Sequence, residues 1–275
     1  MNPLGCSKQC HFCLRWRLEG GHEDPQDMDV VYDQIRRITE PSIMIFDNDF
    51  LCSAERLNRL CDRLEADAIR KNFICYGSVH SILHHREAIA RFSSHGLAAV
   101  LVGYESFNPA ELRDYRKKST VEDNIEAARY MKEIGVDVWA SFMMHPDWST
   151  SDFRSFRAYV RTLRPHISSC TPLTPFPGLP YYDTYKDRLL VAPEDYEQWT
   201  FGVVTIQPLK MTLRRYYIEI MKTNLFIAFV VTRPGYLVSK FGPMTLMRIT
   251  GGSLKLMWRY IRLAYQHNQS LDNKS

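Results

Sequence analysis

The chain has 275 residues, enough for one or two domains, and an α/β barrel of this length folds as one. Its composition, 45% hydrophobic and 24% charged, excludes a disordered tail, a collagen-like fibre and a disulfide-stapled miniprotein. The net charge of +4 is unevenly divided, because residues 207–275 hold eleven Lys or Arg against two acidic residues. This basic C-terminal quarter predicts contact with something anionic.

No hydrophobic stretch precedes Cys6, so we expect no signal peptide. The longest purely apolar run, 225–231, has seven residues, far fewer than the roughly 20 that a membrane-spanning helix needs. We therefore expect a cytoplasmic protein that is either soluble or bound at a membrane surface.

Short β-rich runs alternate with helical patterns over the first 171 residues. Strands are predicted for the apolar runs, namely 42–46, 72–76, 98–102, 136–143 and 166–171. Helices are predicted for the periodic stretches that follow the first four of these, namely 57–64, 87–95, 121–134 and 151–163. The strands recur about every 30 residues, which is the length of a βαβ unit. The pattern predicts an α/β fold with a parallel sheet covered by helices, either a barrel or a doubly wound sheet, and chemistry at the carboxyl ends of the strands.

The segment 172–182 is dense in proline and is predicted to be a shaped loop, because proline fixes the backbone and disfavours helix and central strand. After Pro193 we expect a mainly helical chain.

Three of the seven cysteines fall together as Cys6-x3-Cys10-x2-Cys13. Such close spacing in a chain without a leader indicates metal or redox chemistry, whereas the other four cysteines are expected to be buried as small apolar side chains. Three thiolates on one short loop can bind three corners of an iron–sulfur cube and leave its fourth iron open to substrate. The alternative is a structural zinc site completed by His11 or His22.

With the aromatic Phe12 before its last cysteine, this motif resembles the signature of radical S-adenosylmethionine (SAM) enzymes, and the resemblance covers about residues 5–200. It implies a partial (β/α)6 TIM-like barrel and a [4Fe–4S] cluster on Cys6, Cys10 and Cys13. It also implies SAM at the fourth iron with Phe12 beside the adenine, reductive cleavage of SAM to a 5′-deoxyadenosyl radical, and an electron donor protein such as ferredoxin or flavodoxin.

Two later segments resemble the cobalamin-binding class of these enzymes. Residues 45–50, with Asp47 and Asp49, resemble the Asp-Asp-x-Phe stretch of that class, and 102–106, with Gly103 and Glu105, resembles its Gly-x-Glu segment. The resemblance implies that these residues help to hold SAM. The alternatives are that both aspartates cap the helix starting near Ser53 and that Glu105 is a solvated loop acid.

The segments 144–148 and 174–178 resemble loops of the hopanoid C-3 methylase type. His145 is therefore a candidate catalytic residue that contacts substrate or carries a proton, or else a loop histidine with a structural hydrogen bond. Only five residues precede Cys6, where the family has a full first strand, so we expect a truncated first strand and no N-terminal cobalamin domain. If cobalamin takes part, we expect a missing domain or a separate cobalamin-binding subunit to supply it.

We expect a radical SAM core over residues 1–200 and a basic helical extension over 201–275. In the extension, one helical face collects the apolar side chains Leu254, Met257, Trp258, Ile261, Ala264 and Tyr265. The opposite face collects Lys255, Arg259, Arg262 and Gln266. This is either an interfacial anchor on anionic lipid at the inner face of the membrane or a helix packed on the barrel. Nucleic acid is not expected, because no nucleic-acid module is apparent.

The leading functional hypothesis is a radical SAM enzyme that functionalises a C–H bond, by methyl transfer to an unactivated carbon of an apolar or lipid-like substrate. The alternatives are a radical SAM cyclase, oxidase or methylthiotransferase, and a truncated, non-catalytic metal-binding or scaffold protein.

Overall fold

The computed structural model describes residues 6, 8–18, 20–21 and 26–272, so His22 lies outside the described residues. Five strands form one sheet in chain order: β1 (Ser42–Ile45), β2 (Asn72–Gly77), β3 (Leu97–Glu105), β4 (Asp137–Met144) and β5 (Ile167–Pro172). Because each strand lies beside its predecessor, this is the order of a barrel wall, whereas the order of a doubly wound sheet reverses. The predicted α/β fold is confirmed.

The first strands pair in parallel and bury their alternate side chains. Ser42 lies opposite Asn72 and Ile45 opposite Cys75, and β2 pairs with β3 after a register shift at Phe73. Phe73 and Cys75 are fully buried, because helices cover this part of the sheet.

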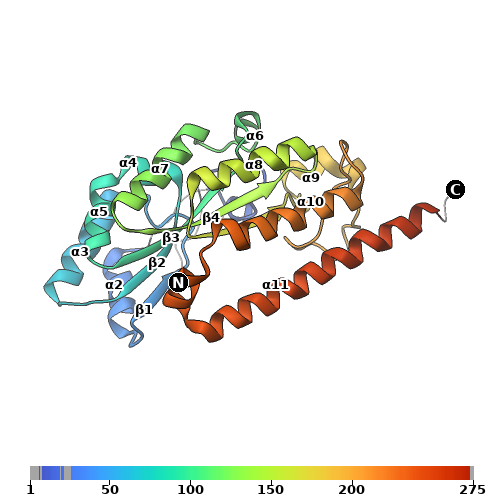
Figure 1. Ribbon diagram of the computed structural model, residues 1–275. Coiled ribbons are helices and arrows are strands. Elements are labelled where there is room, and N and C mark those ends of the chain that lie inside the picture. The colour runs from blue at the N-terminus through green and yellow to red at the C-terminus, as the bar shows by residue number, and fades with distance from the viewer. Residues whose placement is uncertain (1–5, 7, 19, 22–25, 273–275) are drawn as a thin grey trace. The chain divides into compact units, whose positions relative to one another are not determined.

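The chain divides into two compact units, one ending at Ser141 and the other starting at Phe142. The first unit holds seven helices within the described residues: α1 (Arg15–Leu18), α2 (Met28–Arg37), α3 (Ala54–Ala66), α4 (Val79–His84), α5 (Arg86–Ser94), α6 (Pro109–Asp114) and α7 (Val121–Glu133). Five of these lie side by side along the sheet in the order α2, α3, α5, α4 and α7 (Figure 1).

The second unit holds β5 and the helices of the C-terminal half: α8 (Thr150–Leu163), α9 (Pro180–Tyr185), the 3₁₀ turn η1 (Lys186–Arg188), α10 (Leu213–Phe226), the π-helical turn η2 (Ile227–Val231) and α11 (Pro234–Asp272). Aromatic rings join α8 to the strand before it. Phe156 lies 5.2 Å from Phe142 and 5.0 Å from Trp148, measured between ring centroids. Helix α10 packs against both α8 and α11.

Two expectations for the second half were wrong in part. The proline-dense segment does not stay a loop to its end, because α9 begins at Pro180, and proline is tolerated in the first turn of a helix, where its missing N–H has no partner to lose. The chain also does not become helical directly after Pro193. Residues 193–212 form turns and extended backbone, and the next helix begins at Leu213.

The helical C-terminal part is confirmed, whereas the domain boundary at residue 200 stays a prediction. Within the described residues, none of the helices combines the length and the apolar character that crossing a bilayer requires.

Candidate functional site

The cysteine loop, defined here as residues 6–13, is folded around the carbonyl group of Cys10. The indole Nε1 of Trp16 donates to this oxygen at 2.8 Å, and the backbone N–H of Cys13 donates to it at 3.2 Å. A further bond ties the loop to the end of α6, because the N–H of His11 donates to the carbonyl of Tyr115 at 3.2 Å. These bonds hold Cys10 and Cys13 together and tie this part of the loop to the end of α6.

All seven cysteines are free thiols. Cys10 is buried, with its Sγ 4.0 Å from the carbonyl oxygen of Arg116, while Cys6 and Cys13 are half-buried. Burial raises the pKa of Cys10 to about 11 and also raises the pKa of Cys13. Thiolates at these positions are costly without a cation, and metal binding is what deprotonates such thiols.

The donor set of the cysteine loop fits an iron–sulfur cube. Three thiols within eight residues match a cube in which three irons each take one thiolate and the fourth iron is left open. In the part of the chain that the structure describes, no three His, Cys, Asp or Glu side chains gather closely enough to hold a single metal ion.

Asp49, just beyond β1, binds the cysteine loop to the sheet. Its carboxylate pairs with the ammonium of Lys8, and it accepts from the hydroxyl of Ser81 at 2.7 Å and the backbone N–H of Ser78 at 3.1 Å. Lys8 also donates to the hydroxyl of Ser78 at 2.6 Å. Burial works to raise the pKa of Asp49, but Lys8 and the two serines outweigh it, so the pKa is lowered.

Asp47 lies two residues before Asp49, and its pKa is shifted in the opposite direction. It is also buried and accepts the N–H of Asp49 at 3.2 Å. Burial is the largest influence on it and raises the pKa of Asp47, against the lowering effect of the Arg56 charge. Among the residues that the structure describes, no lysine or arginine forms an ion pair with Asp47. Neither aspartate caps α3, since the hydroxyl of Ser53 accepts from Arg56 at 3.3 Å and does so itself. The capping alternative was therefore wrong.

Glu105 is the last residue of β3, and its backbone and its carboxylate are both held in an unusual arrangement. Its backbone has φ of 65°, in the left-handed region that a non-glycine residue rarely adopts. Its carboxylate accepts from Nζ of Lys117 at 3.0 Å, with both side chains largely buried. Burial works to lower the pKa of Lys117, but the charges of Glu105 and Cys10 outweigh it and the pKa is raised. Glu105 is thus a buried, paired acid, so the alternative of a solvated loop acid was wrong, and its role toward SAM stays a prediction.

Gly103 makes this pair possible. A Cβ at that position would overlap Oε1 of Glu105 and would lie 3.0 Å from Nζ of Lys117. Because Gly103 has no side chain, the carboxylate of Glu105 can occupy the space beside its Cα.

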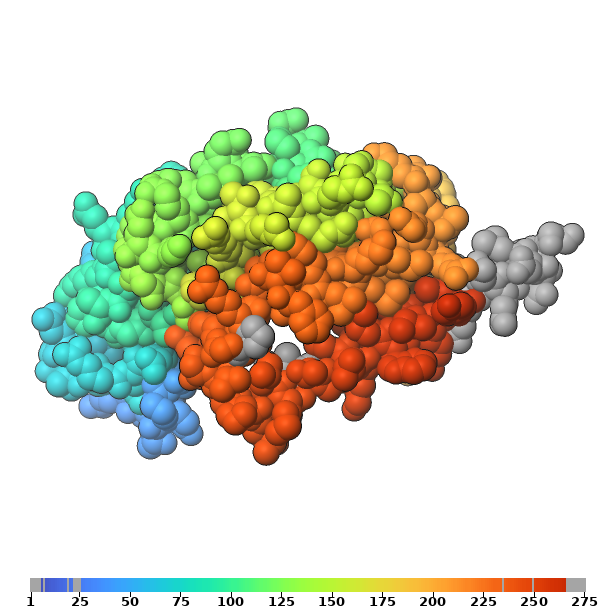
Figure 2. Space-filling view, in the orientation of Figure 1, coloured from blue at the N-terminus to red at the C-terminus, as the bar shows by residue number. Residues whose placement is uncertain are grey.

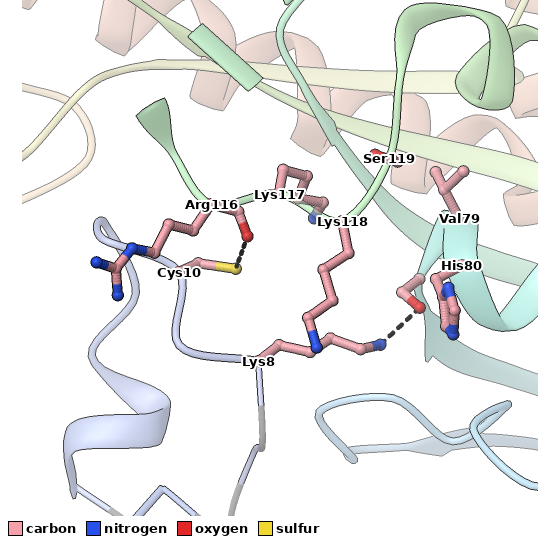
Figure 3. A pocket seen from close by; sticks show the side chains of 9 residues that line it. Lys8, Cys10, Val79, His80, Arg116, Lys117, Lys118 and Ser119 are labelled. Carbon is pink, nitrogen blue, oxygen red and sulfur yellow. Dashed lines mark hydrogen bonds between the residues drawn. The ribbon is translucent and has the colours of Figure 1, made fainter. Parts of the chain in front are cut away.

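A small pocket opens between the cysteine loop, the start of α4 and the segment after α6, as Figure 3 shows. It is lined by Lys8, Cys10, Ser78, Val79, His80, Arg116, Lys117, Lys118 and Ser119. Four of these nine side chains are cationic. Their charge complements an anionic thiolate-bound cluster, whose reduction potential depends on nearby charge.

Phe12 is half-buried, and its ring stands edge-on to that of Tyr115, with 5.6 Å between their centroids. All the predicted site residues described so far belong to the first unit: Cys6, Cys10, Phe12, Cys13, Asp47, Asp49, Gly103 and Glu105.

His145, the remaining predicted site residue, belongs to the second unit and has a polar contact at each ring nitrogen. Nδ1 accepts the N–H of Asp147 at 3.1 Å, so in the neutral ring Nε2 carries the proton and faces the hydroxyl of Tyr185 at 3.1 Å. Asp147 is held by the guanidinium of Arg188, with one bond of 3.1 Å, and by the N–H of Leu209 at 3.1 Å. These contacts orient the imidazole.

Lys8, Ser78 and Ser81 were not predicted. Ser78 could have been found as a serine that follows a strand and caps the next helix, and Lys8 from its place between two cysteines. Ser81 lies inside α4, where no sequence signal marks it.

The family model of the radical SAM superfamily matches residues 3–160. The chain belongs to this superfamily. Hopanoid C-3 methylase from Methylococcus capsulatus (strain ATCC 33009 / NCIMB 11132 / Bath) is 24% identical over 220 residues, which are 80% of this chain and 42% of the relative. The radical SAM chain thus spans less than half the length of that curated relative.

Solved structures of cobalamin-dependent enzymes share its fold. OxsB with aqua-cobalamin and SAM bound aligns with a TM-score of 0.62 and 14% identity over 83% of this chain and 40% of that one. The methyltransferase TsrM from Kitasatospora setae, with cobalamin and a [4Fe–4S] cluster bound, aligns with a TM-score of 0.58 and 18% identity over 68% of this chain and 36% of that one. Membership of the radical SAM superfamily implies a [4Fe–4S] cluster and SAM as cofactors, which favours the iron–sulfur assignment over zinc.

Proposed function

We propose that this protein is a radical SAM enzyme that transfers a methyl group to an unactivated carbon of an apolar or lipid-like substrate. The observation that carries the proposal is the three-thiol loop, which Lys8 and Asp49 bind to the carboxyl end of β1 beside the buried Glu105–Lys117 pair. In a parallel α/β fold this edge is where catalytic groups gather.

Cys6, Cys10 and Cys13 would hold the [4Fe–4S] cluster. A [4Fe–4S] cluster held there would supply the one electron that reductively cleaves SAM to methionine and a 5′-deoxyadenosyl radical, and that radical would abstract hydrogen from the substrate. The chain's own part is positional. Lys8 fixes the loop, and the cations around it lower the cost of three adjacent thiolates.

Asp47 is the residue we propose for the ammonium of SAM. A buried carboxylate without a cationic partner gains most from meeting one, and burial already raises the pKa of Asp47. Asp49 is committed to Lys8, so its proposed role is to position the loop. Glu105, oriented by Lys117 and accommodated by Gly103, would accept from the ribose hydroxyls or the ammonium, and the half-buried Phe12 would flank the adenine.

The methyl-transfer part rests on the similarity to hopanoid C-3 methylase and on the cobalamin-dependent enzymes that share the fold. In this proposal cobalamin comes from a domain or subunit outside the chain, and a ferredoxin or flavodoxin supplies the electron. A cytoplasmic location is part of the proposal, because a reducing compartment keeps the three thiols free for iron.

We also propose that His145 contacts the substrate or carries a proton. Its Nε2–H points to Tyr185, so a proton would pass along that bond. His145→Gln is expected to leave 5′-deoxyadenosine formation unchanged and to lower substrate turnover. A fall in the free energy of unfolding, with turnover per folded molecule unchanged, would instead give His145 a structural role.

The test of the ligands is anaerobic reconstitution with iron and sulfide, followed by assays for iron, sulfide and zinc. The unaltered chain should hold about four irons and, with SAM and a strong reductant, should release 5′-deoxyadenosine. Cys6→Ala, Cys10→Ala and Cys13→Ala should each lose both properties, whereas Cys52→Ala, the matched control from outside the loop, should keep them. Unchanged iron and SAM cleavage in Cys6→Ala would contradict the ligand assignment.

Products from methyl-labelled SAM test the reaction class. Label in the substrate, with cobalamin supplied, would support methyl transfer. Hydrogen abstraction without transfer of label would favour a cyclase or oxidase, and sulfur transfer would favour a methylthiotransferase. Bound zinc, or a cluster that never cleaves SAM, would favour the non-catalytic reading.

A further inference from the structure

Helix α11 is two helical segments joined at a break. Gly242 has φ of 78°, and Pro243, which follows it, cannot continue the hydrogen-bond ladder of the preceding turn. The later segment packs on α10 within the second unit. Tyr260 and Ala264 are buried, with the ring of Tyr260 5.6 Å from that of Tyr217. One face of this segment is therefore already covered.

A second apolar face of the same segment is exposed. It consists of Met247, Leu254, Trp258, Ile261 and Tyr265, here called the α11 stripe. Spacings of seven, four, three and four residues place these side chains on one side of a helix. Trp258 is 72% exposed, and Met247, Leu254 and Tyr265 are each exposed by 60% or slightly more. Figure 2 places the later turns of α11, coloured red, at the surface of the molecule.

The exposure of these side chains corrects the apolar face that the sequence predicted for this helix. The apolar side chains expected to act together are divided, because Met257 and Ala264 turn toward the packed side while Leu254, Trp258 and Tyr265 turn to solvent. One face of the helix thus packs on α10, and a second face is exposed.

A cationic row borders the α11 stripe along its length. It consists of Arg248, Lys255, Arg259 and Arg262, here called the α11 cations, each directly after a stripe residue. No acidic residue occurs between Glu219 and Asp272, so nothing on this segment neutralises the row. The occupant of the surface must therefore offer apolar contact and negative charge side by side.

We propose that the α11 stripe and the α11 cations form a surface that docks on an anionic phospholipid bilayer. Leucine, methionine and tryptophan enter the boundary of headgroups and acyl chains, while the adjacent Lys and Arg reach anionic headgroups. The stripe runs for about 27 Å at 1.5 Å per residue, and Trp and Tyr favour this interface. The inference does not depend on the proposed reaction.

Other occupants match the surface less well. A nucleic acid would satisfy the α11 cations and leave the α11 stripe in water. A second copy of the chain, paired through the stripe, would bring two cationic rows together, which like charges oppose. Charge complementarity thus favours lipid.

The test is flotation of the full chain with vesicles of neutral phosphatidylcholine alone, or with 30% phosphatidylglycerol, a composition chosen within roughly the anionic range of natural leaflets. The chain should float with the anionic vesicles and stay behind with the neutral ones, and high salt should release it. Lys255→Gln with Arg262→Gln should weaken the partition coefficient about 25-fold, at about fivefold per cation. Leu254→Ser with Trp258→Ser should weaken it by roughly tenfold or more for each side chain.

Matched controls keep the result specific. Tyr196→Ser removes another exposed aromatic ring of the second unit, and Lys132→Gln with Arg154→Gln removes two exposed cations outside α11. Both should bind vesicles like the unaltered chain. Trp258 emission should shift to the blue on anionic vesicles, and Trp258→Phe should bind without that shift.

The proposal is overturned if the chain binds neither kind of vesicle, or if the substitutions in α11 bind as well as the controls do. It is also overturned if sedimentation equilibrium gives a dimer that Leu254→Ser with Trp258→Ser dissociates while vesicle binding is absent, because the stripe would then be an interface between copies. Failure of SAM cleavage in the same preparation bears only on the proposed function.

Discussion

Charged side chains have opposite surroundings in two regions of the molecule. One region is the edge of the first unit where β1 and β3 end, here called the edge, and the other is helix α11 of the second unit. At the edge, Asp49 and Glu105 are buried and each meets a lysine. On α11, the cations have few acidic partners and stand beside exposed apolar side chains, Trp258 above all. Asp49 and Glu105 thus have a lysine partner at the edge, whereas the cations of α11 border an exposed apolar face.

The difference separates two kinds of function. Buried charge pairs cost desolvation energy and contribute little net stability, so their value at the edge is geometric, because they fix the places of the cysteine loop and the acids. An exposed apolar and cationic face costs solubility and gains only when a partner covers it. The paired charges at the edge therefore support the proposed binding of a small cofactor, and the exposed face of α11 supports the proposed docking on a large surface.

The largest expected effect tests whether the stability of the edge depends on the ion pair between Glu105 and Lys117. Lys117→Met leaves Glu105 buried without its cation and should lower the free energy of unfolding by about 3–5 kcal/mol, measured by anaerobic urea unfolding. Adding Glu105→Gln should restore most of that loss, because the uncompensated charge disappears. A double variant no more stable than Lys117→Met would contradict the pairing.

The two aspartates sharpen the comparison within the edge. Asp49→Asn removes the counter-charge of Lys8 and should cost about 2–3 kcal/mol and speed the loss of iron to a chelator. Asp47→Asn, where burial already raises the pKa, should change stability by less than about 0.5 kcal/mol and raise the KM for SAM. Equal KM values for the two variants would remove the distinction between a positioning and a binding aspartate.

Two glycine substitutions compare the regions directly. Gly103→Ala places a Cβ against Glu105 and Lys117 and should cost about 2 kcal/mol by thermal or urea unfolding. Gly251→Ala, inside α11 with nothing within 4 Å of its Cβ, should stabilise the chain by about 0.5–1 kcal/mol. A neutral Gly103→Ala would mean that the Glu105 side chain moves aside freely.

A smaller effect than at the edge pairs is expected for Asp147 and Arg188, whose side chains are 21% and 22% exposed. Burial works to raise the pKa of Asp147, but Arg188 and the N–H of Leu209 outweigh it, so the pKa is lowered. Its stabilisation is therefore full above the unfolded-state pKa of about 3.9 and is lost as the pH falls through the lower folded-state pKa. Asp147→Asn should cost about 1.5 kcal/mol at pH 7, and the two unfolding curves should converge below about pH 4. A difference that stays constant down to pH 3 would contradict this.

Much of the fold could be predicted from the sequence, because parallel strands buried on both faces appear as apolar runs. The five predicted strands agree with β1 to β5 to within about three residues at either end. The short helices α4 and α6 could not be found, since six residues show too little periodicity. Their positions depend on caps, the hydroxyl of Ser78 and the side chain of Asn108.

For the site, the sequence predicted the chemical groups better than their partners. The cysteines and Glu105 are local motifs, whereas the Lys8–Asp49 pair joins positions 41 residues apart, and no periodicity reports such a contact. The division of the apolar face of α11 was missed for a similar reason. A wide apolar stripe does not say which part meets α10.

Because the chain is synthesised from its N-terminus, two bonds of the cysteine loop can form only late in synthesis. Lys8 donates to the hydroxyl of Ser78, which lies 70 residues further along the chain. The sulfur of Cys10 contacts the carbonyl group of Arg116, which lies 106 residues further along. A ribosome that adds about 5–20 residues per second takes roughly 5–20 s over the longer interval. The three thiols thus leave the ribosome well before the segment that shelters them exists. Productive delivery of iron in the cell has to wait for that segment, and a chain stalled before it would offer reactive thiols to any passing oxidant or metal.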